Sequence, residues 1–64
     1  MCESKVIIIE GGKRNIVMDA AATIKVDGDT IICTDITGES VEVKNVKVSE
    51  MNLLRHEILL ERSR

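Results

Sequence analysis

Cys2 is the residue best suited to chemistry in this chain, because its thiol lies next to the first backbone nitrogens. A thiolate and a neighbouring nitrogen can close a chelate ring around a divalent, fairly soft metal ion. The nitrogen is the terminal amine if Met1 is removed and a deprotonated amide nitrogen if Met1 stays. From residue type alone, a metal ligand and an incidental exposed thiol are equally good interpretations of Cys2.

One chain offers only one sulfur and one nitrogen in this segment. Two chains meeting at a dimer axis would offer two of each, and a square-planar set of that kind fits nickel(II) or copper(II) better than zinc. Zinc usually takes a tetrahedral set from spaced cysteines and histidines, and the sequence has no such spacing. The metal hypothesis therefore requires a homodimer.

Cys33 and His56 are the other residues with reactive side chains. Cys33 follows Ile32 in an apolar run, where cysteine usually packs as a small hydrophobic residue. His56 lies among charged neighbours, which favours a solvated side chain. The chain has no Gly-rich phosphate loop and no CxxC or HExxH motif, so we predict that it is not an enzyme.

The size and composition of the chain indicate one small domain that associates with itself. A domain of 64 residues (1–64) buries only about 60% of the surface that its unfolded chain exposes. The chain contains no Phe, Trp or Tyr, yet 44% of its residues are hydrophobic. An aliphatic surplus on so short a chain predicts a homodimer.

The charge balance disfavours nucleic acid as a partner. The formal net charge is -2, from 11 acidic and 9 basic residues, and no aromatic side chain is present to stack on bases. The alternative hypothesis is a small RNA- or protein-binding β-barrel in which Cys2 is incidental. Its basic contacts would be Lys5, Lys13, Arg14, Lys25, Lys44 and Lys47.

No secretory signal opens the sequence, and no apolar run approaches the ~18 residues that a membrane span requires. We therefore expect a cytoplasmic protein with no membrane partner. In that reducing compartment both cysteines are expected as thiols.

The strands that must position Cys2 are marked by turn residues. Apolar runs at 6–9 and 15–19 flank Gly11-Gly12, and runs at 23–26 and 30–35 flank Asp27-Gly28, which predicts two hairpins. Residues 20–22 are expected to form a corner or a single helical turn. Turns recur every ~8–12 residues, as in a small all-β barrel or sandwich.

Residues 39–44 form another alternating strand, which follows a turn at Thr37-Gly38. The apolar positions then change parity between Val43 and Val46. Because side chains alternate with a period of two along a strand, this change predicts a bulge or bend at Lys44-Asn45.

Residues 50–62 are ambiguous. Met51, Leu54 and Ile58 recur at helical spacing among good helix formers, and on these local grounds a helix is favoured. The alternative is a closing hairpin with strands at 51–54 and 58–61 and a turn at 55–57 that contains no glycine.

The chain resembles the CooT family of nickel-binding proteins, which are associated with maturation of carbon monoxide dehydrogenase. The resemblance covers most of the chain. It includes Met1-Cys2 with Lys5-Val6, the Gly11-Gly12 turn, the Asp27-Gly28 region, and the segments Met51-Asn52-Leu53-Leu54 and Ile58-Leu59-Leu60-Glu61.

The resemblance implies an all-β, SH3-like homodimer of about six to seven short strands. It also implies a nickel(II) ion held at the subunit interface by Cys2 and supplied to carbon monoxide dehydrogenase or its maturation proteins. Only Cys2 carries over as a ligand, since Cys33 and His56 are not part of the family pattern. The resemblance further implies that residues 50–62 form the closing hairpin, against the local preference for a helix.

Overall fold

The computed structural model describes residues 3–63, and in this range the chain is all-β, with seven strands and no helix. The predicted all-β class is therefore confirmed. No helix in this part of the chain could cross a membrane. The strands are β1 (Ser4–Glu10), β2 (Lys13–Ala21), β3 (Thr23–Asp27), β4 (Thr30–Thr34), β5 (Ser40–Lys44), β6 (Val46–Asn52) and β7 (Glu57–Arg62).

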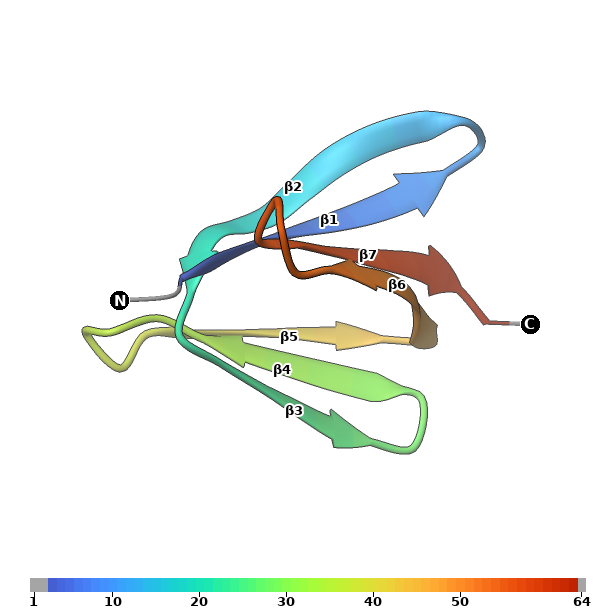
Figure 1. Cartoon of the computed structure of the whole chain (residues 1–64). Helices are drawn as coiled ribbons and strands as arrows, with labels where there is room; N and C mark the ends of the chain where they lie inside the picture. Colours follow the sequence, from blue (N-terminus) through green and yellow to red (C-terminus); the bar gives the residue numbers. More distant parts are fainter. Residues whose placement is uncertain (1–2, 64) are drawn as a thin grey trace.

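The strands form two sheets that enclose one core (Figure 1). The first sheet has four strands in the order β2-β1-β7-β6, and the second has three in the order β3-β4-β5. β1 and β7 are parallel, whereas every other paired neighbour is antiparallel. β1 is therefore an inner strand, flanked by β2 and β7 along its length.

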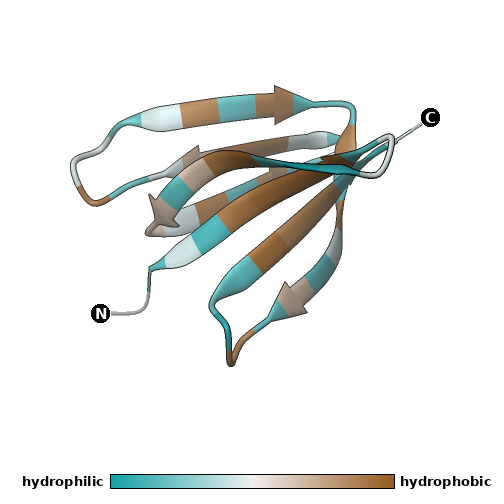
Figure 2. Cartoon of the chain, turned by 90° about the horizontal axis from the view of Figure 1, so that it is seen from above, coloured by the Kyte–Doolittle hydropathy of each residue, from teal (hydrophilic) through white to brown (hydrophobic). Residues whose placement is uncertain are grey.

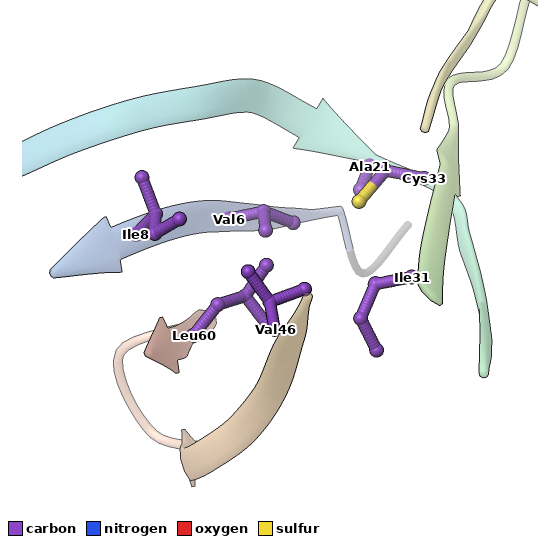
Figure 3. Packing of buried hydrophobic residues seen from close by; sticks show 7 residues of the cluster. All are labelled: Val6, Ile8, Ala21, Ile31, Cys33, Val46 and Leu60. Carbon is purple, nitrogen blue, oxygen red and sulfur yellow. The ribbon is translucent and has the colours of Figure 1, made fainter. Parts of the chain in front are cut away.

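The core lies between the two sheets and is entirely aliphatic apart from one thiol. The buried residues shown in Figure 3 come from both sheets, and several of them, such as Ile31 and Leu60, have no exposed surface. Burying an aliphatic side chain of this size contributes about 1.5–3 kcal/mol. The cluster consists of Val6, Ile8, Ala21, Val46 and Leu60 from the first sheet and Ile31 and Cys33 from the second.

Both predicted hairpins are present. Gly11 and Gly12 join β1 to β2 with φ values of 54° and 80°, and Gly28 joins β3 to β4 with a φ of 60°. Positive φ costs most residues energy but costs glycine almost none, so glycine marks these turns in the sequence. The predicted corner at 20–22 contains fewer residues than expected. β2 continues through Ala21, and only Ala22 forms the bend.

The predicted bend at Lys44-Asn45 is confirmed. Asn45 separates β5 from β6 and has a φ of 62°, a left-handed conformation that asparagine tolerates better than most residues. Its carbonyl accepts a hydrogen bond of 2.7 Å from the Ser63 amide, and the neighbouring Val46 amide donates to the Asp29 carbonyl at 3.0 Å. These contacts hold the chain where it passes from one sheet to the other.

The locally favoured helix at 50–62 is wrong, and the hairpin that the family resemblance implied is confirmed. β6 and β7 pair antiparallel, and β7 also pairs along the open side of β1, with Ile8 opposite Leu60. A helix would leave that side of β1 unpaired and remove Leu60 from the core. The turn covers residues 53–56 instead of 55–57, and His56 adopts a φ of 53° where a glycine would be expected.

Candidate functional site

The predicted metal ligand, Cys2, lies outside the described residues, which begin at Glu3. The structure therefore gives the surroundings of the strand that follows Cys2. β1 begins at Ser4, two residues after the cysteine.

The start of β1 is fixed on both sides. On one side Ser4 lies opposite Ala21 at the end of β2. On the other side, where β7 runs beside β1 (Figure 1), Lys5 lies opposite Glu57, and the Lys5 amide donates a hydrogen bond of 2.8 Å to the His56 carbonyl. Because β1 is an inner strand, the direction in which the chain enters the sheet is set by backbone pairing.

The second sheet reaches the same end of the molecule. The Ala22 amide donates to the Thr34 carbonyl at 2.7 Å, which joins the end of β2 to the end of β4. The β4–β5 turn begins directly after Thr34. The start of β1 thus lies at an end of the molecule to which both sheets contribute.

Asp35 organises the β4–β5 turn. Its Oδ1 atom accepts hydrogen bonds from the Thr37 hydroxyl at 2.6 Å, the Thr37 amide at 2.9 Å and the Glu39 amide at 3.0 Å. The bond from the Thr37 hydroxyl is the main cause that holds the pKa of Asp35 below its ordinary value of 3.8. The charged form of this carboxylate therefore stabilises the folded turn.

Acid is expected to remove this contribution of Asp35 to stability. Since the folded pKa is lower than 3.8, the contribution is fully present above 3.8 and is lost as the pH falls through the folded pKa. Asp35→Asn keeps an oxygen acceptor but has no charge. Thermal unfolding should show wild type more stable than Asp35→Asn at pH 7, with the difference shrinking as the solution is acidified. A difference that is constant with pH would contradict this role.

Cys33 and His56 lie where the sequence interpretation placed them. The Cys33 thiol has no exposed surface, and burial raises its pKa above the ordinary value. A buried thiol with a raised pKa reacts with metals and electrophiles far less readily than an exposed thiolate does. His56 is exposed on the β6–β7 turn. The packing role of Cys33 and the solvated position of His56 are both confirmed.

Comparison with known proteins decides the family of this chain. The family model described as "CO dehydrogenase accessory protein CooT" matches residues 1–61. The chain belongs to the CooT family. The description of this family supports a role in the maturation of CO dehydrogenase. No curated protein matches the chain.

The CooT assignment agrees with the fold. The chain is similar to the crystal structure of a protein assigned as CooT from Carboxydothermus hydrogenoformans, with 24% sequence identity and a TM-score of 0.85. The likeness covers 98% of this chain and 100% of that one. At this level of identity the likeness shows a shared fold and does not transfer a site.

Residues 3–63 of this CooT-family chain contain no group of three or more His, Cys, Asp or Glu side chains that could hold a metal ion. The nickel hypothesis requires only Cys2 and an adjacent nitrogen from each of two chains, so this finding does not bear on it. The role of Cys2 as a ligand stays a prediction.

The basic residues of the alternative RNA-binding hypothesis are spread over both sheets. They lie on β1, β2, β3, β5 and β6. Two of them have acidic neighbours: Arg14 lies 3.9 Å from Glu57, and Lys47 lies 3.8 Å from Glu61. This spread over five strands and the two acidic neighbours disfavour binding of a phosphate backbone by these residues.

Sequence analysis missed the exposed leucines of the β6–β7 turn. Leu53 is 78% exposed and Leu54 is 95% exposed, although a helix would have placed Leu54 on its apolar face. The usable signal was their position directly after Asn52. Its Oδ1 atom accepts a hydrogen bond of 3.1 Å from the Arg55 amide, as expected for a turn-forming residue.

Proposed function

We propose that this CooT-family chain is a cytoplasmic, non-catalytic nickel(II)-binding protein that supplies nickel for maturation of carbon monoxide dehydrogenase. In this proposal it acts as an SH3-like homodimer. The observation that carries the proposal is the family match over residues 1–61, a range that includes Cys2. Its recipient is carbon monoxide dehydrogenase or one of that enzyme's maturation proteins.

The proposed ligand set consists of two Cys2 thiolates and two nearby backbone nitrogens, one pair from each chain. A set of two sulfurs and two nitrogens suits the square-planar geometry of nickel(II). Cys33 cannot supply a competing thiolate, because it is fully buried in the core. Cys2 is therefore the only cysteine assigned to nickel.

The fold supports this arrangement through β1. Because β2 and β7 flank β1, the position of Ser4 relative to the sheet is set by backbone hydrogen bonds. Only the few residues before it then have to adjust when nickel binds. A short segment on a rigid strand suits a protein that must bind a metal ion and later release it to a recipient.

Native mass spectrometry with and without nickel tests this proposal. We expect a dimer that takes up one nickel ion per two chains, and the same spectrum shows whether Met1 is retained. Zinc at the same concentration serves as the control and should be retained less well. Nickel carried in proportion to monomers, or no nickel retained, would contradict the shared site.

A further inference from the structure

His56 has an unusual backbone conformation at the end of the β6–β7 turn. Its φ is 53°, and within residues 3–63 only one other residue besides glycine, Asn45, has a positive φ. A positive φ costs such a residue energy, so it persists only where the surrounding structure holds it. The side chain of His56 is exposed and lies in the hydrophilic stretch that Figure 2 shows between the hydrophobic tip of the turn and the middle of β7. Backbone contacts, and not burial of the imidazole, therefore hold this conformation.

The chain is fixed on both sides of His56. Before it, the Arg55 amide donates a hydrogen bond of 3.1 Å to the Asn52 side chain. After it, Glu57 begins β7 and lies opposite Asn52 on β6. The Oε1 atom of Glu57 lies 3.7 Å from the Arg55 Nε atom and 3.9 Å from the Arg14 Nη2 atom on β2. The direction of the His56 carbonyl is thus set by the turn and by the first residue of β7.

The carbonyl of His56 holds the first part of β1. It accepts the hydrogen bond of 2.8 Å from the Lys5 amide, and the pairing of β7 with β1 also begins at Lys5. In the sequence only Glu3 and Ser4 separate Lys5 from Cys2. A change in the direction of the His56 carbonyl would therefore release β1 just after the residue that we assign to nickel.

We infer that His56 is a positioning residue for the start of β1 and, through it, for the nickel-binding segment, and that it acts through its left-handed backbone conformation. The inference rests on the proposed function, because it assigns nickel to Cys2. Without the hold on Lys5, the segment before it would have more conformations to lose when nickel binds. The residue type at position 56 should then affect nickel affinity only through its tolerance of a positive φ.

Three substitutions of His56 separate this backbone role from a role of the imidazole, because all three remove the ring. Glycine and asparagine tolerate the left-handed conformation, whereas the β-branched valine strongly disfavours it. We expect His56→Gly and His56→Asn to bind nickel as wild type does. His56→Val should bind nickel about tenfold more weakly, the lower end of the cost of disturbing groups that orient metal ligands.

Asn45→Val is the matched control, because it places the same side chain at the other position with a positive φ. The Asn45 carbonyl accepts its hydrogen bond from the Ser63 amide, just after β7 ends. Since β1 and β7 are parallel, this contact lies at the opposite end of the sheet from the start of β1 (Figure 1). Asn45→Val should therefore lower the stability towards urea, as His56→Val does, and leave nickel affinity unchanged.

Two measurements should be made on wild type and all four variants. Hydrogen exchange of the Lys5 amide, followed by NMR without nickel, reports its bond to the His56 carbonyl. Isothermal titration with nickel(II) reports the affinity. We expect Lys5 exchange to be about tenfold faster in His56→Val and unchanged in the other three variants. If circular dichroism shows that His56→Val does not fold, His56→Ala takes its place.

Unchanged Lys5 exchange in His56→Val would overturn the inference, and so would faster exchange with unchanged nickel affinity. Equal losses of affinity in all three His56 variants would assign the effect to the imidazole, and an equal loss in Asn45→Val would assign it to overall stability. Either result would also overturn it. The proposed function fails separately: nickel binding undiminished by Cys2→Ser refutes the nickel site, whereas Lys5 exchange still decides whether His56 holds the start of β1.

Discussion

Replacing Cys2 with serine is expected to lower the nickel(II) affinity by on the order of 100-fold or more, because loss of a direct ligand should exceed the 10–100-fold cost of losing an outer-shell group. A serine hydroxyl stays protonated near neutral pH and is a harder, weaker donor for nickel than a thiolate. Since the proposed dimer contains two Cys2 residues, the substitution removes both sulfurs. Isothermal titration of the two proteins with nickel(II) measures the difference.

Cys33→Ala and His56→Asn are the controls for this titration. Cys33→Ala removes the only other thiol, which is fully buried. His56→Asn replaces the single imidazole of the chain with a residue that tolerates the positive φ of this position. Both variants should bind nickel as wild type does. Undiminished nickel binding by Cys2→Ser would refute the proposed site.

The same titration should depend on pH in wild type. Binding requires a thiolate and, if Met1 is retained, a deprotonated amide, so each site releases protons when nickel binds. An unperturbed cysteine has a pKa of about 8.5, so the affinity should rise with pH below that value, about tenfold per unit for each proton released. In Cys2→Ser the thiolate part of this dependence should disappear.

The features that local chemistry dictates were predictable from the sequence. The turns at Gly11-Gly12 and Gly28 require positive φ, and glycine marks such positions directly. The bend at Asn45 was predictable from the change of parity between Val43 and Val46, because a strand cannot shift its buried face without one. The assignment of Cys2 as a ligand also rests on residue type and position, and it stays a prediction.

The C-terminal hairpin was not predictable from local pattern. Residues 57–62 contain good helix formers, and their strand conformation depends on pairing with β1 at the other end of the chain. Such non-local pairing overrides intrinsic propensity. The same error hid the exposed leucines, because a helix over these residues would have placed Leu54 on its apolar face.

The β6–β7 turn also lacks the usual glycine marker. His56 adopts the left-handed conformation that glycine normally supplies, and its carbonyl accepts the hydrogen bond from Lys5. This backbone hydrogen bond holds His56 beside the start of β1, although the two segments are distant in sequence. Only the three-dimensional structure could show that the end of this turn lies beside the start of β1.

Leu60→Ala is expected to destabilise the folded chain by about 2–5 kcal/mol, the usual cost of truncating a buried leucine. Leu60 has no exposed surface and lies in the core cluster with Val6, Ile8 and Val46 (Figure 3). A chain of 64 residues has a total stability of roughly 3–10 kcal/mol. The substitution should therefore remove a large part of that stability. Leu60 lies on β7, the strand that pairs with β1 on the side opposite β2.

Urea denaturation at one fixed protein concentration measures this effect, because the stability of the proposed dimer would depend on concentration. Val26→Ala is the control: Val26 is 60% exposed on the edge strand β3, so the cost should stay below about 1 kcal/mol. Equal losses in the two variants would mean that Leu60 does not hold the sheets together. A large loss confined to Leu60→Ala should be accompanied by weaker nickel binding, since the start of β1 is positioned by its pairing with β7.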